Sequence, residues 1–272
     1  MRVDVDGVGI EYDVSGPDDG RPVVLLHGFP DSAALWRHQV DPLAAAGFRV
    51  ITPDLRGFGR SDAPDAVDAY SLLVTAGDVT AILDDAGVDR AHVVGHDFGA
   101  ALAWVVAMFL PDRTDHLVTM SVGHPGSFRL AEFEQGKASW YMLLFQFEGV
   151  AEQWLRDQDW ANLRAWSGHP DMERVIAGFE GGASLTAALN WYRANITPEA
   201  WVAPAAELPS VAAPTMGLWG SDDFALLEAQ MQQSGEHVTG GWRYERVEAA
   251  GHWLQLDRPD EVTRLLLDFL PV

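Results

Sequence analysis

An aspartate, Asp97, stands at the centre of the short sequence Gly-His-Asp-Phe-Gly, residues 95–99. The two glycines let a strand turn abruptly into a helix, because segments without side chains can pass closely. Such a turn exposes its central side chain and places the N–H groups of the helix start beside it. The pattern predicts that Asp97 is a nucleophile. The structural alternative is an aspartate that only caps the following helix.

A histidine and an acid that could assist Asp97 follow it along the chain. His252 lies on a loop before the last helix, and its near-neutral pKa allows it to accept a proton from water. Asp222 and Asp223 stand just after an apolar stretch at 213–220, and either carboxylate could orient the imidazole and stabilise its cation. The order nucleophile, acid, histidine is the order of the α/β-hydrolase fold.

Backbone donors for an oxyanion are expected at two places. The sequence His-Gly-Phe-Pro, residues 27–30, ends an apolar strand. In this fold one N–H comes from that loop and the other from the residue after the nucleophile. We therefore expect the N–H groups of Phe29 and Phe98 to form the oxyanion hole. His27 is interpreted as a structural residue that holds the loop.

The elements that must position these residues are alternating strands and helices. Several short runs are β-branched and apolar on both faces, which is typical of central strands in a parallel sheet covered by helices. Two weaker strands are expected within residues 1–16, and helices are expected at 71–87, 99–112 and 261–270. The apolar strands are expected at 22–28, 48–54, 91–96, 116–122, 213–220 and 242–252.

The alternation of strand and helix patterns stops after Gly123. Residues 125–205 are rich in Trp, Phe and Ala and contain no convincing strand. We predict an α/β fold of the α/β-hydrolase type, with a mostly parallel central sheet flanked by helices and a helical cap inserted after a core strand. The predicted division is a first core part at 1–124, the cap at 125–205 and a second core part at 206–272.

Composition excludes several other kinds of function. The formal net charge of −22 disfavours a nucleic-acid partner, which needs clustered Lys and Arg. The chain has no cysteine, so thiolate metal sites and a cysteine nucleophile are excluded. No apolar run approaches the roughly 18 residues of a membrane span, and the first residues lack a signal-peptide pattern. We expect a cytoplasmic protein without metal or cofactor; a homo-oligomer remains open.

On these motifs the chain resembles the epoxide hydrolases of the α/β-hydrolase superfamily. In that family the acid stands directly before Phe, which selects Asp223 over Asp222, and two cap tyrosines point at the epoxide oxygen. The matching residues are Tyr141 and Tyr192. Many members carry Trp at the position of Phe98, but the contact needed there is a backbone N–H. The segments that carry the resemblance are HGFP (27–30), DLRGFGRSDAP (54–64), GHDFGA (95–100), SWYMLLFQFEG (139–149), LNWYRANI (189–196), SDDF (221–224) and GHW (251–253).

The resemblance implies a reaction that converts an epoxide and water into a vicinal diol. Asp97 would form a covalent alkyl ester, and tyrosines with pKa values near 10 would protonate the leaving alkoxide. His252, with Asp223 behind it, would then activate water. His124 and Trp191 are expected to line the substrate pocket.

Four other interpretations use the same nucleophile or the same fold. Haloalkane dehalogenases hold the halide with side-chain N–H donors, but the corresponding positions here are Phe29 and Phe98. Fluoroacetate dehalogenases bind a carboxylate with arginines after the nucleophile, and residues 98–111 contain none. The third reading is a non-catalytic ligand-binding protein, which the complete set of nucleophile, acid and histidine disfavours. A serine esterase is disfavoured because no serine occupies the turn.

Overall fold

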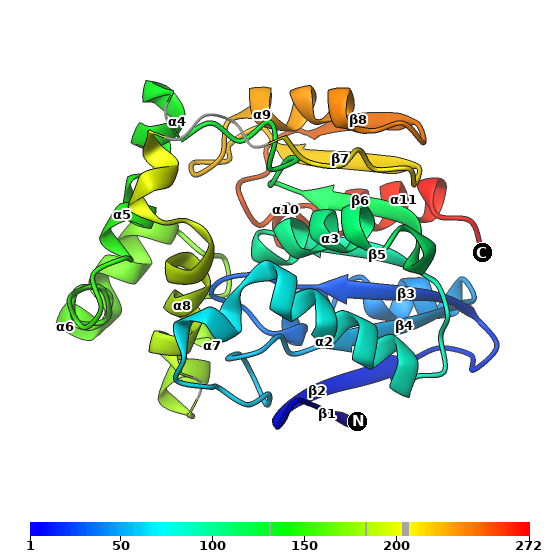
Figure 1. Cartoon of the computed structure of the whole chain (residues 1–272), viewed down its shortest axis with the longest axis horizontal. Coiled ribbons are helices and arrows are strands. Elements are labelled where there is room, and N and C mark those ends of the chain that lie inside the picture. Colours follow the sequence, from blue (N-terminus) through cyan, green and yellow to red (C-terminus); the bar gives the residue numbers. More distant parts are fainter. Residues whose placement is uncertain (131, 183, 203–206) are drawn as a thin grey trace.

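One sheet organises the chain (Figure 1). The computed structural model describes residues 1–130, 132–182, 184–202 and 207–272. Within these residues the sheet has eight strands in the order β1-β2-β4-β3-β5-β6-β7-β8. β1 and β2 pair antiparallel, as do β2 and β4, and all the other pairs are parallel. The strands are β1 (Arg2–Val5), β2 (Val8–Ser15), β3 (Arg21–Leu26), β4 (Phe48–Pro53), β5 (Ala91–His96), β6 (Thr114–Met120), β7 (Thr215–Gly220) and β8 (Trp242–Val247).

The apolar residues of the central strands are buried on both faces of the sheet. Along β3, Val24 and Leu26 belong to one hydrophobic cluster, whereas Val23 and Leu25 belong to another. Successive strand residues point to opposite faces, so each face needs its own helical cover. The first cluster includes side chains of α2 and α3, and the second includes side chains of α1 and α11. These helices are α1 (Val40–Ala45), α2 (Leu72–Asp85), α3 (Phe98–Phe109) and α11 (Pro259–Phe269).

Five helices lie between β6 and β7, beyond the carboxyl ends of the parallel strands (Figure 1). We call them the helical insertion. Its described residues contain no strand, as the sequence predicts for this region. The predicted boundary at residue 205 lies outside the described residues. The helices are α4 (Phe133–Ala138), α5 (Trp140–Leu144), α6 (Val150–Ser167), α7 (Met172–Glu180) and α8 (Leu185–Asn195).

The predicted mostly parallel sheet with helices on both faces is confirmed, but one strand is shorter than expected. The sequence predicts a strand at 242–252, whereas β8 ends at Val247. Ala249 has φ 51°, a left-handed conformation that ends an extended strand. The chain therefore turns early, and His252 lies on a loop before the short helix α10 (Leu254–Asp257). In the described part of the chain, no helix has the length and apolar character needed to cross a membrane.

Parallel topology brings the chemical motifs to one edge of the sheet. The loop 27–30 follows β3, Asp97 follows β5, Asp223 follows β7 and His252 follows β8. The carboxyl ends of parallel strands share an edge, and this is where ligands bind in open α/β sheets. The insertion lies at the same edge (Figure 1). The fold therefore places residues that are far apart in sequence beneath a helical cover.

Candidate active site

Asp97 occupies a sharp turn between β5 and α3. Its φ is 53° and its ψ is −123°, a conformation that is sparsely populated by residues other than glycine. A Cβ at Gly95 would lie 2.5 Å from the carbonyl carbon of Gly99, so the strand and the helix approach too closely for a side chain there. The Asp97 side chain makes no capping hydrogen bond to α3. The turn therefore holds the carboxylate away from the helix, against the alternative of a simple helix cap.

The loop after β3 surrounds the Asp97 carboxylate with backbone donors. The N–H of Phe29 donates to Oδ1 of Asp97 at 2.8 Å. A Cβ at Gly28 would lie 2.5 Å from Cβ of Asp97 and 2.7 Å from the backbone nitrogen of Phe98. The small space beside Gly28 thus adjoins both predicted oxyanion donors. His27 is buried and its Nε2 accepts the N–H of Leu55 at 2.9 Å, which fits its predicted role in holding the loop.

His252 lies between two carboxylates. Its Nε2 is 3.4 Å from Oδ2 of Asp97, and its Nδ1 is 3.0 Å from Oδ2 of Asp223. The other oxygen of Asp223 accepts the backbone N–H groups of Ala225 and Leu226 at 2.9 and 3.1 Å. Asp222, the alternative acid, is exposed to solvent. The structure therefore brings Asp97, His252 and Asp223 together and leaves Asp222 outside.

The two carboxylates control the charge on His252. Burial alone would lower the pKa of His252, but the charges and hydrogen bonds of Asp223 and Asp97 raise it to about 10. Burial would raise the pKa of Asp223, yet its interaction with His252 and two backbone N–H groups lowers it below the usual value. In the resting protein, His252 is therefore a cation held between carboxylates at neutral pH.

Two hydrogen bonds hold the backbone of His252 in place. Nε2 of His96 and the hydroxyl of Ser121 both donate to the carbonyl oxygen of His252, each at 2.9 Å. Burial, followed by the nearby charge of His252, lowers the pKa of His96 to about 4. His96 thus stays neutral and can hold the loop without adding a charge. Sequence reasoning did not assign either residue a role, although His96 ends β5 directly before Asp97 and Ser121 directly follows β6.

A small apolar cavity opens onto Asp97. Its volume is about 140 Å³. Asp97 and Tyr192 lie in its wall with aliphatic and aromatic side chains, and Asp97 is the one acidic or basic residue among the described residues that line it. We call this space the inner cavity. The remaining lining residues are Leu72, Phe98, Ala101, Val122, Gly123, Pro125, Phe128, Met142, Asn195, Ile196 and Leu226.

Tyr141 and Tyr192 are buried next to this site. Their ring centroids are 6.0 Å apart, and the ring of Tyr192 stands edge-on to Phe98 at 4.7 Å. Burial, followed by the charge of Asp97, raises the pKa of both phenols well above the usual value. Both hydroxyls therefore keep their protons at neutral pH. The Arg193 side chain next to Tyr192 reaches the carbonyl of Phe145, which ties α8 to the segment after Tyr141.

Two residues predicted to line the pocket lie outside the lining of the inner cavity. His124 is buried, accepts the N–H of Gly126 on Nδ1 and stacks on His237 with ring centroids 4.1 Å apart. Its neighbours Gly123 and Pro125 line the cavity instead. Trp191 packs behind Phe98 and donates its indole N–H to the carbonyl of Arg56 at 3.0 Å. Hydrogen bonds thus hold both rings in the core, one to a nearby residue and one to a distant part of the chain.

A buried carboxylate that sequence reasoning missed connects three parts of the site. Oδ2 of Asp31 accepts the indole N–H of Trp253 at 3.0 Å, and Oδ1 lies 3.2 Å from Nε2 of His169. Nδ1 of His169 accepts the N–H of Asp171 at 2.9 Å, so Nε2 carries the proton that is donated to Asp31. Asp31 therefore joins the loop after β3 to the residue after His252 and to the insertion. Its position directly after Pro30 was the available signal.

In the described part of the chain, no group of three or more histidine, aspartate and glutamate side chains could hold a metal ion. The site is built instead from a carboxylate, an imidazolium, backbone N–H groups and protonated phenols. A carboxylate next to an apolar cavity can attack an uncharged electrophile, and the neighbouring groups can supply and remove protons.

Comparison with known proteins gives a consistent result. A sequence profile of the family described as "alpha/beta hydrolase fold" matches residues 21–259. Epoxide hydrolase A of Mycobacterium tuberculosis is 31% identical over 98% of this chain and 96% of its own length. Epoxide hydrolase 3 of Xenopus tropicalis is 33% identical over 99% of this chain and 77% of its own length. The crystal structure of epoxide hydrolase A from Mycobacterium thermoresistibile has a TM-score of 0.80 at 30% identity, covering 99% of this chain and 97% of that chain.

Proposed function

The chain belongs to the epoxide hydrolases of the α/β-hydrolase superfamily, and from this premise we propose that it hydrolyses an epoxide to a vicinal diol through an ester on Asp97. The observation that carries the proposal is the placement of Asp97 between His252 and an apolar cavity that also contains Tyr192. A charged nucleophile suits a two-step displacement and hydrolysis when one side holds a proton donor and the other a histidine that becomes the base after the first step.

In the first step, a carboxylate oxygen of Asp97 attacks one carbon of the epoxide and the C–O bond of the ring breaks. The products are an alkyl ester and an alkoxide. Oδ1 is held by the N–H of Phe29 at 2.8 Å, which orients the carboxylate before the reaction. The apolar wall of the inner cavity weakens solvation of the attacking charge and excludes competing water.

The alkoxide takes a proton from Tyr141 or Tyr192. Because burial and the charge of Asp97 raise the pKa of each phenol, both are protonated when the substrate arrives. Attack neutralises Asp97, so its contribution to the raised pKa disappears as the alkoxide forms. The phenols thus become better acids at the moment when a proton is needed.

The second step needs a neutral His252. Esterification removes the charge of Asp97, and with it part of the interaction that raises the pKa of His252. The imidazolium then returns a proton through solvent to the phenolate, which leaves a neutral base. His252 accepts a proton from water as the water oxygen attacks the ester carbonyl carbon. The N–H groups of Phe29 and Phe98 stabilise the tetrahedral oxyanion. Its collapse breaks the bond between the carboxyl carbon and the alkyl oxygen. The departing alkoxide takes the remaining proton of the attacking water, which leaves the diol, the Asp97 carboxylate and the His252 imidazolium.

The surroundings of Asp97 give less support to the dehalogenase reading. A departing halide needs N–H donors from side chains, and the residues flanking the carboxylate are Phe29 and Phe98. The nearby indoles of Trp191 and Trp253 donate to Arg56 and Asp31 respectively. Both indole N–H groups are therefore already engaged by acceptors of the protein. A non-catalytic ligand-binding role leaves the buried pair of Asp223 and His252 without a purpose.

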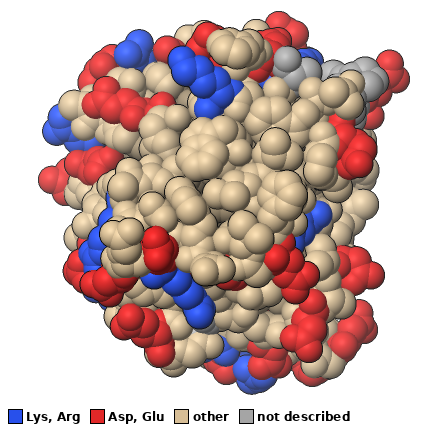
Figure 2. Space-filling view, turned by 90° about the vertical axis from the view of Figure 1, so that its left-hand side faces the viewer, with Lys and Arg blue, Asp and Glu red and all other residues tan. Residues whose placement is uncertain are grey.

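The cavity favours a small, uncharged epoxide. Its volume of about 140 Å³ is close to that of an engineered cavity of about 150 Å³ that accepts benzene. One ring or a short alkyl chain therefore fits beside Asp97, whereas two rings do not. The face of the molecule on the insertion side is uncharged over much of its centre, with charged side chains toward its edge (Figure 2). An apolar substrate would meet little competing charge there.

The test uses the His252→Gln variant with 1,2-epoxybutane. Removal of the base is expected to lower the rate of ester hydrolysis by about 10²- to 10⁴-fold while ester formation continues. Intact-protein mass spectrometry should show one added epoxide mass, and the adduct should disappear in the double variant that also carries Asp97→Ala. The wild-type protein should convert the epoxide to the diol and leave 1-chlorobutane unchanged.

Two results would count against this function. Absence of diol formation by the wild-type protein across several small epoxides would remove the activity. An adduct that persists after Asp97→Ala would keep the activity but place the nucleophile elsewhere.

A further inference from the structure

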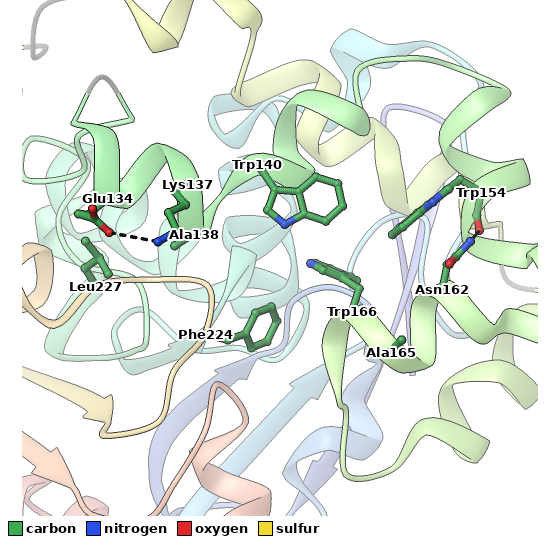
Figure 3. Close-up of a pocket in the computed structure, with 10 residues that line it drawn as sticks. All are labelled: Glu134, Lys137, Ala138, Trp140, Trp154, Asn162, Ala165, Trp166, Phe224 and Leu227. Atoms are coloured by element: carbon green, nitrogen blue, oxygen red, sulfur yellow. Dashed lines mark hydrogen bonds and ion pairs between the residues drawn. The ribbon is translucent and has the colours of Figure 1, made fainter.

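A second and larger pocket lies beside the site, with a volume of about 580 Å³. We call it the outer pocket. Trp140 and Trp154 line it from the insertion, together with Trp166 at the end of α6 and Phe224 after β7 (Figure 3). The rings of Trp140, Trp166 and Phe224 gather around one space in this view. Asp97 is absent from the described residues that line it, so the outer pocket does not itself reach the nucleophile.

Two of these rings separate the outer pocket from the candidate catalytic residues. The ring of Trp166 lies 4.5 Å from that of Tyr141 and stands edge-on to Phe224 at 6.0 Å. The ring of Phe224 lies 6.0 Å from that of His252. Each side chain therefore faces the outer pocket on one side and a candidate catalytic residue on the other. We call Trp166 and Phe224 the partition.

The partition is held by packing. The buried Nε1 of Trp166 has no hydrogen-bond partner among the described residues. Its ring is surrounded by other rings, including Phe29 and Phe145 with centroids 6.3 and 5.3 Å away. Replacing Trp166 or Phe224 by a smaller apolar residue therefore leaves no buried polar partner stranded within the described structure. It removes volume between the outer pocket and the candidate catalytic residues.

We propose that Trp166 and Phe224 set the upper size of the epoxide by closing off the candidate catalytic residues Tyr141 and His252 from the outer pocket. The inference rests on the proposed epoxide hydrolase function. With the partition in place, the substrate must fit the inner cavity of about 140 Å³. With the partition reduced, one arm of a longer substrate extends into the outer pocket of about 580 Å³, where Trp140 offers a further aromatic surface. An epoxide with an aryl group on each carbon then becomes a substrate.

The experiment compares trans-stilbene oxide, which carries a phenyl ring on each epoxide carbon, with 1,2-epoxybutane. In Trp166→Ala and Phe224→Leu, the ratio of kcat/KM for the diaryl epoxide to that for the small epoxide should rise at least about tenfold, the scale of one or two methylene-sized changes in a pocket. The matched control is Trp140→Ala. Trp140 lines the outer pocket and contacts Trp154 at 5.8 Å, outside the partition, so its ratio should remain that of the wild type.

Two partition variants are compared because a loss of activity in one of them could come from a misplaced catalytic residue. Trp166 supports Tyr141, so Trp166→Ala can lose activity on both substrates, whereas Phe224 has no ring contact with Tyr141 among the described residues. An unchanged ratio in an active Phe224→Leu variant would overturn the proposal.

A second measurement needs no variant. Wild-type hydrolysis of 1,2-epoxybutane should continue at its full rate when trans-stilbene oxide is added, because the partition excludes the diaryl compound. Competitive inhibition would show that the larger molecule already enters and would overturn the size limit. Failure of the wild type to hydrolyse the small epoxide would instead overturn the proposed function.

Discussion

Gly28→Ala tests the site with the addition of a single methyl group. A Cβ at this position would lie 2.5 Å from Cβ of Asp97 and 2.7 Å from the backbone nitrogen of Phe98, and closer still to Oδ1 of Asp97. These separations are too short for non-bonded atoms, so the carboxylate or the loop after β3 must shift. The displaced groups are the nucleophile and both expected oxyanion donors.

The magnitude follows from what the methyl group displaces. Loss of one oxyanion donor lowers kcat by about 10²- to 10³-fold. Gly28→Ala disturbs two donors as well as the carboxylate, so we expect kcat to fall by at least about 100-fold. Overpacking of a buried site destabilises a protein by about 1–3 kcal/mol. The variant should therefore remain folded at 25 °C with a lowered melting temperature.

Stopped-flow kinetics with 1,2-epoxybutane separates the two steps. Both ester formation and ester hydrolysis should slow, because the carboxylate acts in the first and the donors act in the second. The matched control is Gly77→Ala. Gly77 lies within α2 with no atom within 4 Å of the added Cβ, so this change should leave kcat unaltered and stabilise the helix by about 0.5–1 kcal/mol. A Gly28→Ala variant with kcat within about threefold of the wild type would refute the assigned geometry.

Two further predictions concern the groups around His252. Asp31→Asn places an amide N–H₂ against one of the two N–H donors from Trp253 and His169. The variant should lose about 1–3 kcal/mol of unfolding free energy, and its kcat should fall by about tenfold. The control is Asp18→Asn, because Asp18 is exposed to solvent. A wild-type kcat in Asp31→Asn would contradict a positioning role. Because the pKa of His252 is raised to about 10, the folded protein keeps a proton that the unfolded chain releases near pH 6.5. The stabilisation is full below pH 6.5 and is lost toward pH 10. The free energy of unfolding from urea titrations should therefore fall by no more than about 5 kcal/mol over this range. The His252→Gln variant should show a flatter decline.

Motifs with strict local requirements could be recognised from the sequence. The glycines around Asp97 indicate that the strand and the helix pass too closely for side chains. The structure shows this directly, since a Cβ at Gly95 would clash with the backbone of Gly99. The loop at 27–30 likewise predicted the N–H of Phe29, which donates to Asp97. The acidic pair was ambiguous by chemistry alone, and the Phe after Asp223 resolved it only through a family resemblance.

Orientation of side chains was less predictable. His124 and Trp191 stand in suitable segments, yet hydrogen bonds hold them in the core, and the partner of Trp191 is Arg56 from a distant part of the chain. His169 carries no signal in its own segment, because its partners Asp31 and Trp253 are contributed by distant parts of the chain. Contacts of this kind depend on how the insertion packs on the sheet.

The sequence by itself determined the order of the proposed nucleophile, acid and histidine, the parallel strands that carry them and the tight turn at Asp97. These features follow from short-range sterics and from the burial of apolar strands, which are encoded within a few residues. Only the tertiary structure decided the charge of His252, the volume available beside Asp97 and the packing of Trp166 and Phe224 against Tyr141 and His252. Each of these depends on distances between groups that the chain brings together from separate segments, and electrostatic and packing energies change steeply with such distances.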